Sequence, residues 1–307
     1  MQATASAIET SGLTKRYGAL TAAADLDLRI EPGQVFGFLG PNGAGKTTTI
    51  RMLMALQRPT RGQARLLGFD ATADSVQIHR RTGFLPGDLE LFGRLTGRQH
   101  IDRFARARGG VDGSVVSQLV ERFQVVTDRP VRQLSTGNRQ KIGLVLAFMH
   151  QPELLVLDEP TSGLDPLMQH EFEDLLRESA GQGRTVFLSS HELAEVQRAA
   201  DRIGIIKQGR LVAEDTVDGL RRAAPVKMQV RFRHPVAAAT LSAVRGVTVT
   251  ATNGPQVELD VTGEVGPVLT VIASHDPVGL ISRPASLDEL FLGFYHQSAD
   301  PETSRAH

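Results

Sequence analysis

Short apolar runs alternate with helical patterns through residues 1–222. These runs lie at residues 35–39, 63–67, 83–85, 154–157, 185–188, 202–206 and 211–213. Ahead of the first run, Leu26, Leu28 and Ile30 alternate with charged residues, which is typical of an edge strand. The turn sequence at residues 31–34 predicts that this strand turns directly into the buried strand at 35–39. Alternating strands and helices predict an α/β domain.

Residues 90–150 follow a different pattern. Between Thr96 and Val126 no run is typical of a strand, and apolar residues instead recur at helical spacing: Val115, Val116, Leu119, Val120 and Phe123. This stretch predicts a helical subdomain inserted into the α/β domain.

The pattern starts again after residue 222. Alternation at residues 226–232, a strand pair around Thr252-Asn253-Gly254 and helical spacing at residues 265–272 predict a small α+β domain over residues 223–296. An amphipathic helix from Leu287 to Phe294 closes this domain, and the polar tail at 297–307 is predicted to be disordered. No group of residues in residues 223–307 suggests catalysis.

A phosphate-binding pattern follows the apolar run 35–39. The pattern G-x-x-x-x-G-K-[ST] is met by Gly40, Pro41, Asn42, Gly43, Ala44, Gly45, Lys46 and Thr47. Glycines let the backbone N–H groups face the β- and γ-phosphates, and the helix that follows adds its positive end. Lys46 would reach the same phosphates, and the Thr47 hydroxyl would help to hold Mg²⁺. The sequence therefore predicts binding of a nucleoside triphosphate.

Two acids end the apolar run 154–157 abruptly. Carboxylates at the end of a buried strand are costly unless a cation meets them. Beside a nucleotide, Asp158 would hold Mg²⁺, directly or through water, and Glu159 would orient and deprotonate the attacking water. Without the phosphate loop, the same residues would be interpreted as a strand that ends in a solvated acidic turn.

A third segment, Leu134-Ser135-Thr136-Gly137-Asn138-Arg139-Gln140, opens a helix about twenty residues before these acids. Taken alone, Ser135 or Thr136 would only cap that helix. Its position ahead of the strand that ends in the two acids favours a functional role in addition to capping.

With these segments in order, the chain resembles the nucleotide-binding subunit of an ABC transporter. Residues 40–48 match the Walker A loop, 134–140 the signature sequence and 154–159 the Walker B strand. Residues 162–165 resemble the D-loop, and His191 resembles the switch histidine. The resemblance covers residues 8–215. It implies a P-loop ABC ATPase core with an antiparallel β edge subdomain and a helical subdomain, followed by the α+β domain.

The resemblance also implies roles for single residues. Thr48 and Asp165 join the ATP-binding set, Tyr17 stacks on adenine and His191 touches the γ-phosphate. Three of these residues also have a purely structural interpretation. Tyr17 could be a half-exposed strand residue, Asp165 before Pro166 could be a helix cap, and His191 lies within a possible capping box, Ser189-x-x-Glu192.

In the family, two cassettes pair head to tail, and each signature helix closes on the ATP of the other. Ser135 and the backbone N–H groups around Gly137, at a helix N-terminus, suit a γ-phosphate. One chain holds one of each motif, so the resemblance implies a second copy or a paralogue as partner. It further implies a separately encoded membrane permease, and the C-terminal domain resembles the appendix of bacterial drug and antibiotic exporters.

Two segments depart from the family pattern. The signature has Thr136 and Asn138 where glycine and glutamine are commonest. In the Q-loop, where the family usually places a glutamine that senses Mg²⁺, this chain has Gly87 followed by Asp88. Asp88 or water could supply the missing oxygen ligand, and both alternatives stay open.

Composition narrows the partners and the compartment. The 34 basic residues equal the 34 acidic ones, and there is no Trp and only two Tyr, which argues against a nucleic-acid partner. The absence of cysteine, of a signal-peptide pattern and of a long apolar run predicts a cytoplasmic chain, and the resemblance implies that it is peripheral to the inner face of the membrane. Arginines just beyond the Q-loop form either a solvated helix face or a docking surface for the membrane partner: Arg94, Arg98, Arg103, Arg106 and Arg108.

The motifs predict an ATPase that uses ATP and Mg²⁺, and the resemblance implies that it is a subunit of an ABC-type exporter. Two alternatives are a soluble ABC ATPase that acts outside transport and, because of Gly87, a nucleotide-dependent binding module with low turnover.

Overall fold

The structure, a computed structural model, describes residues 6–286 and Glu289, and its contacts divide the chain between Asp215 and Thr216. Each of these two units is described by itself. The division falls ahead of the boundary expected at residue 222, because helix α8 (Val217–Ala223) groups with the second unit. The helix expected at Leu287–Phe294 and the tail at 297–307 lie outside the described residues, apart from Glu289.

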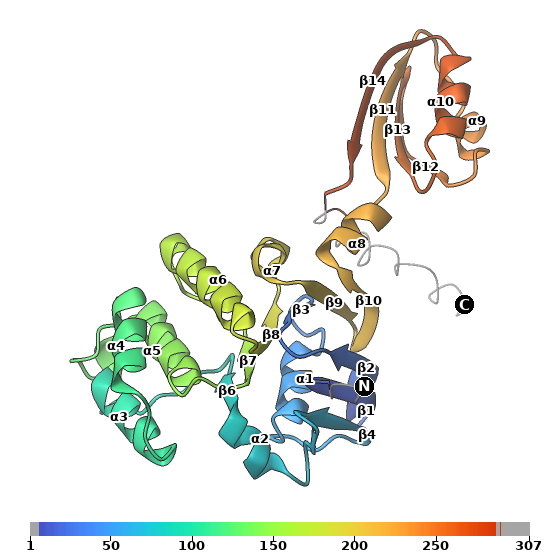
Figure 1. Ribbon diagram of the computed structural model, residues 1–307. Helices are drawn as coiled ribbons and strands as arrows, with labels where there is room; N and C mark the ends of the chain where they lie inside the picture. The colour runs from blue at the N-terminus through green and yellow to red at the C-terminus, as the bar shows by residue number, and fades with distance from the viewer. Residues whose placement is uncertain (1–5, 287–288, 290–307) are drawn as a thin grey trace. The chain divides into compact units, whose positions relative to one another are not determined.

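A largely parallel sheet forms the centre of the first unit (Figure 1). Its strand order is β10-β9-β3-β8-β7-β6, with the bounds β3 Val35–Leu39, β6 Thr82–Leu85, β7 Leu154–Asp158, β8 Thr185–Ser190, β9 Arg202–Lys207 and β10 Arg210–Thr216. Every residue of β3, β7 and β8 is buried, which explains their continuous apolar runs. Strands β3, β7 and β8 pair in parallel, so the segments that follow their carboxyl ends gather at one edge of the sheet.

A second, antiparallel sheet has the order β2-β1-β4-β5, with the bounds β1 Ile8–Tyr17, β2 Leu20–Ile30, β4 Arg61–Leu66 and β5 Phe69–Asp70. The expected alternation holds, because Leu26, Leu28 and Ile30 are buried and their neighbours are exposed. The expected turn at residues 31–34 is also confirmed, because β2 ends at Ile30 and β3 begins at Val35. Strand β3 already has β8 on one side and β9 on the other, so the turn carries the chain from one sheet into the other.

Helices cover the sheets and form the inserted subdomain. Helices α1 (Lys46–Leu53), α2 (Ser75–Arg81), α6 (Pro166–Gly181) and α7 (Leu193–Ala199) belong to the α/β part. Helices α3 (Gly97–Ala107), α4 (Gly113–Arg122) and α5 (Thr136–Phe148), with the 3₁₀ turn Val131–Gln133, gather beside it (Figure 1). Thr96 and Gln99 form a capping box at the start of α3, and Asp112 caps α4. The helical pattern read between Thr96 and Val126 therefore matches the observed elements.

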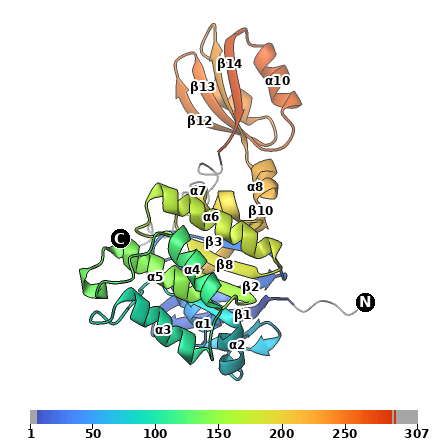
Figure 2. The ribbon, with the colours of Figure 1, turned by 60° about the vertical axis from the view of Figure 1, so that its left-hand side comes forward.

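The second unit is a four-stranded antiparallel sheet with two helices on one face (Figure 2). The elements run β11 Val226–Phe232, α9 Ala238–Ser242, β12 Val247–Asn253, β13 Gln256–Val261, α10 Gly266–Ala273 and β14 Pro277–Pro284. The strand order β12-β13-β11-β14 with this β-α-β-β-α-β sequence is the ferredoxin-like arrangement. Its core combines Met228, Val230 and Phe232 with Leu241, Val268 and other apolar residues of β12, β13 and α10.

Candidate functional site

The phosphate loop joins the buried end of β3 to the start of α1. Gly45 has φ +110°, and a Cβ there would lie 2.2 Å from the carbonyl oxygen of Ala22. Gly43 also has positive φ, and a Cβ at Gly40 would lie 2.7 Å from the carbonyl oxygen of Ile206. Only glycine fits both the backbone conformation and the close approach at Gly45. These glycines shape the curled loop that the sequence pattern predicts.

Lys46 is held inside this loop. It is 5% exposed, and its Nζ donates to the carbonyl oxygens of Gly40 at 2.6 Å and Pro41 at 3.3 Å. The same ammonium lies 3.1 Å from Oε1 of Glu159, which arrives from the end of β7. Pro41, Asn42 and Gly43 around it are exposed. An ammonium at this depth, in a loop of backbone groups open to solvent on one side, suits a phosphate group.

Asp158 and Glu159 differ in their surroundings although they are adjacent. Asp158 is 1% exposed, and its Oδ1 accepts a hydrogen bond from the Ser189 hydroxyl at 2.5 Å. Glu159 has φ +50° and reaches toward Lys46 and His191. The Nδ1 of His191 donates to Glu159 Oε2 at 2.6 Å. The Glu159 carboxylate therefore bridges the lysine of the phosphate loop and the histidine that follows β8.

The capping-box alternative for His191 is wrong. Ser189 lies inside β8, and α7 begins only at Leu193. The hydroxyl that accepts from the backbone N–H of Glu192 belongs to Ser190, at 2.9 Å. His191 therefore lies in the short link between β8 and α7, and its side chain is about half exposed.

The signature helix α5 begins as the sequence predicts, and it packs against the D-loop of its own chain. Ser135 caps the helix by accepting from the N–H of Asn138 at 3.2 Å. A Cβ at Gly137 would lie 2.4 Å from the carbonyl oxygen of Gly163, so this close approach requires glycine. Asp165 caps α6 through the N–H of Met168 at 3.0 Å. Both capping interpretations are therefore correct, and Ser135 is exposed.

Two amides of α5 have roles that the sequence did not reveal. The side chain of Asn138 accepts from the N–H of Val126 at 2.9 Å and donates to its carbonyl oxygen at 3.0 Å. The departure from glutamine at this position thus ties α5 to the loop after α4. Gln140 donates to the carbonyl oxygen of Pro160 at 3.0 Å, which joins α5 to the segment after the two acids. Neither partner is near in sequence, so spacing carries no signal of them.

Tyr17 and Asp88 lie at the margins of the site. Tyr17, at the end of β1, is 44% exposed, and the Nζ of Lys15 lies 5.3 Å from its ring centroid. Its stacking on adenine stays a prediction. Asp88 is 86% exposed and pairs with Arg51 of α1 at 3.1 Å, so the observed contact gives no support to a metal-ligand role. The residue beside Asp158 is instead Gly87, where a Cβ would lie 3.1 Å from Asp158 Oδ2.

The residues present fit Mg²⁺ bound together with a nucleotide. Within the described part of the chain, no three His, Asp or Glu side chains gather into a metal site of their own. Mg²⁺ prefers few protein oxygens together with phosphate and water. Buried Asp158, with Oδ2 beside the small residue Gly87, and half-buried Thr47 in the first turn of α1 offer that kind of set.

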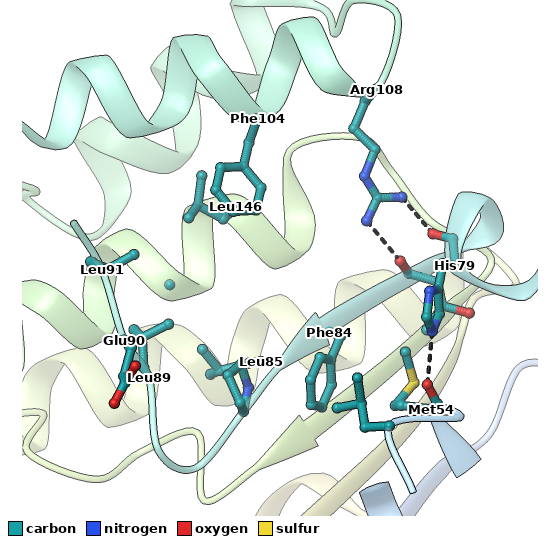
Figure 3. Close-up of a pocket in the computed structure, with 14 residues that line it drawn as sticks. Met54, His79, Phe84, Leu85, Leu89, Glu90, Leu91, Phe104, Arg108 and Leu146 are labelled. Atoms are coloured by element: carbon teal, nitrogen blue, oxygen red, sulfur yellow. Dashed lines mark hydrogen bonds between the residues drawn. The ribbon is translucent and has the colours of Figure 1, made fainter. Parts of the chain in front are cut away.

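A groove of about 330 Å³ separates β6 from the helical subdomain (Figure 3). Phe84 and Leu85 of β6 line one side, and Phe104 and Leu146 line the other. At one end Arg108 donates to the carbonyl oxygens of His79 at 2.7 Å and Thr82 at 3.2 Å. Arg108 therefore ties α3 to the end of α2. The other arginines of the expected stretch are exposed: Arg94, Arg98, Arg103 and Arg106.

Comparison with known proteins identifies the family. The sequence model described as ABC transporter matches residues 23–162. The daunorubicin resistance ATP-binding protein DrrA3 of Streptomyces coeruleorubidus is 36% identical over 306 residues, which cover 93% of this chain and 95% of that protein. The chain belongs to the ABC transporter family. Within this family it is an ATP-binding subunit with ATPase activity.

Other relatives, and solved structures of similar proteins, agree. The bacitracin transport ATP-binding protein BcrA of Bacillus licheniformis is 38% identical over 70% of this chain and 71% of its own length. The structure of an ATP-binding subunit of an ABC transporter superposes with a TM-score of 0.65 at 30% identity, over 70% of this chain and 92% of that chain. A dimeric cassette in a post-hydrolysis state, bound to ADP and phosphate, has a TM-score of 0.63 at 21% identity over 68% and 98%, and shares the fold.

Proposed function

We propose that this ABC ATPase binds ATP and Mg²⁺ between two cassettes and powers an exporter of the drug or antibiotic type. The observation that carries the proposal is the Glu159 carboxylate, held between Lys46 at 3.1 Å and His191 at 2.6 Å. The names of the similar proteins, which concern daunorubicin resistance and bacitracin transport, support the exporter class. They also favour a transport subunit over a soluble ABC ATPase.

Hydrolysis breaks the bond between the β–γ bridging oxygen and the γ-phosphorus. Glu159 orients the attacking water and accepts its proton, and the ammonium of Lys46 stabilises charge on the phosphate oxygens. His191 holds the Glu159 carboxylate through Nδ1, and in this proposal it also contacts the γ-phosphate. Thr47 and Asp158 would hold Mg²⁺, which supplies further positive charge against the phosphate oxygens.

The second half of each ATP site would come from another cassette. Ser135 and the backbone N–H groups around Gly137 stand at the N-terminus of α5, where a γ-phosphate is favoured by the helix dipole. Ser135 is exposed, and its hydroxyl accepts from the N–H of Asn138 in its own helix. The partner is therefore a second copy of this chain or a paralogue.

A membrane subunit on a separate polypeptide would complete the transporter. No helix within residues 6–286 has the length and apolar character to cross a bilayer. The apolar groove between β6 and α3 offers a place for a short segment of that subunit. This arrangement would place the ABC ATPase on the cytoplasmic face of the membrane.

The Glu159→Gln variant tests the proposed chemistry. The amide keeps the size of the side chain and removes the base, so ATP turnover is expected to fall roughly 10²–10⁴-fold while ATP still binds. Steady hydrolysis by the wild-type chain would also exclude the low-turnover binding module that Gly87 suggests. Wild-type turnover in Glu159→Gln would refute the role of Glu159.

A further inference from the structure

The hydroxyl of Ser189 lies between the two acids of the site. Ser189 stands directly opposite Asp158 in the parallel pairing of β7 with β8, and it is fully buried. Its hydroxyl donates to Asp158 Oδ1 at 2.5 Å and accepts from the backbone N–H of Glu159 at 3.1 Å. A serine hydroxyl has one proton to donate, so donation to Asp158 leaves its lone pairs for Glu159. One side chain thus contacts both acids.

The backbone of Glu159 needs such support. Its φ of +50° lies in the left-handed region, which a residue with a Cβ adopts only when its surroundings impose it. The N–H that would hold this conformation is shared between the hydroxyl of Ser189 and its carbonyl oxygen, at 3.1 and 3.3 Å. This left-handed turn sends the Glu159 side chain toward Lys46 and His191.

The same hydroxyl also determines which oxygen of Asp158 is free. Oδ1 is engaged by Ser189, whereas Oδ2 faces Gly87, where no side chain intervenes. A carboxylate held through one oxygen presents the other in a fixed direction. Rotation of the Asp158 carboxylate is thereby restrained on the side of the phosphate loop.

From these contacts we propose that Ser189 is a positioning residue for ATP hydrolysis. It fixes the Glu159 backbone that aims the base and orients Asp158 Oδ2 toward Mg²⁺. This role rests on the proposed function of Glu159 and Asp158. Ser189 itself touches no reacting atom.

The next residue offers a matched control. Ser190 is as fully buried as Ser189 and belongs to the same strand, but its hydroxyl points to the other side. It donates to Glu195 Oε2 at 2.8 Å and accepts from the N–H of Glu192. A change of serine to alanine therefore removes a buried hydroxyl from β8 in both cases, but only at Ser189 does it release the two acids.

The experiment compares Ser189→Ala, Ser189→Thr and Ser190→Ala in the full chain. Initial rates of ATP hydrolysis are measured against ATP and Mg²⁺ concentration, and calorimetry measures binding of a non-hydrolysable ATP analogue at increasing Mg²⁺. We expect Ser189→Ala to lower kcat on the order of 10–100-fold with the KM for ATP within about twofold. It should also raise the Mg²⁺ concentration at half-maximal analogue binding. Ser189→Thr should keep most of the wild-type kcat and Mg²⁺ dependence. Ser190→Ala should change neither kcat nor the Mg²⁺ dependence.

Several outcomes would overturn the role of Ser189. Wild-type kcat and Mg²⁺ dependence in Ser189→Ala would do so, as would an equal loss in Ser190→Ala, because equal losses mean that β8 only needs its hydroxyls to fold. Failure of Ser189→Thr to recover turnover while it melts like the wild type would also count against it. If Glu159→Gln loses turnover and Ser189→Ala does not, only this inference fails. If Glu159→Gln keeps its turnover, the proposed function fails as well.

Discussion

The two units bury their polar groups in opposite ways. At the ends of β3, β7 and β8 the first unit buries an ammonium, a carboxylate and a hydroxyl: Lys46, Asp158 and Ser189. In the described part of the second unit, the buried side chains are apolar. One of its ion pairs, Lys227 with Asp260 at 2.9 Å, lies on the sheet with about 30% of each side chain exposed.

This difference indicates that the first unit buries groups for chemistry, whereas the second buries groups for stability. Burying charge costs free energy even when it is paired, whereas an apolar core stabilises a small domain directly. The first unit therefore tolerates buried polar and charged side chains where, in the proposed function, a phosphate and a metal ion bind. The core of the second unit is apolar, so changes in each unit should have different effects.

The largest expected effect follows from removing the buried ammonium. Lys46→Ala removes the cation that meets the phosphates, so ATP binding and turnover should be lost. Wild-type protein at ATP 100-fold above its Kd should gain roughly 2.7 kcal/mol of stability, and the variant should gain none. Differential scanning calorimetry with and without ATP measures this. An equal ATP-dependent rise in Tm in both proteins would contradict the assignment of Lys46.

A charge in the apolar groove should break coupling to the membrane subunit but leave the ATP site intact. Phe104→Asp places a carboxylate among Phe84, Leu85 and Leu146, where a partner segment would have to bury it. Transport with the membrane subunit should fall at least tenfold, while ATP hydrolysis by the isolated subunit stays within about twofold. Val76→Asp, an equally drastic change at an exposed site outside the groove, is the control. Normal transport by Phe104→Asp would rule out docking at this groove.

A core truncation in the second unit should affect stability alone. Phe232 is 1% exposed and lies in the apolar cluster, so Phe232→Ala should destabilise this unit by about 3–5 kcal/mol. Because every residue proposed to bind or hydrolyse ATP belongs to the first unit, basal ATP hydrolysis below the melting transition should not change. Chemical denaturation measures the loss of stability, and an ATPase assay on the same protein measures basal turnover. A parallel loss of basal turnover would mean that the second unit supports the site.

The smallest effect concerns His150, a half-buried histidine of the first unit. Burial and the positive charge of Arg108 lower the pKa of His150 from 6.5 to about 4. Between these values the unfolded chain binds a proton that the folded chain does not, so stability should fall as pH falls from about 6.5 to about 4. In His150→Gln this part of the pH dependence should disappear. Tm measured from pH 7 to pH 4 compares the two proteins, and identical slopes would contradict the pKa shift.

Patterns in the sequence predicted the fully buried strands and the segments whose structure depends on neighbouring residues in the chain. The strands β3, β7 and β8 are continuous apolar runs, and the phosphate loop has fixed spacing, so both could be found without the fold. Strand β1 was missed because register shifts interrupt its alternation. Strand β14 was missed because most of its residues are exposed, which leaves no apolar period to detect.

The contacts between distant segments could not be predicted. Ser189 meets Asp158 only because β7 and β8 pair in a particular register, and Gln140 meets Pro160 only because α5 packs against the loop after β7. A serine in a strand has no sequence pattern that distinguishes such a role. Asp88 shows the converse, because a plausible ligand in the sequence pairs with Arg51 on the surface.

The central claim is that one chain holds half of an ATP site and another cassette completes it. The most direct measurement is the molar mass of Glu159→Gln by light scattering, without nucleotide and with saturating ATP and Mg²⁺. Because this variant should bind ATP and not hydrolyse it, we expect a monomer without nucleotide and a stable dimer with ATP, which Ser135→Arg should abolish by placing bulk and charge at the exposed start of α5. A Glu159→Gln chain that binds ATP and remains monomeric would contradict the composite site.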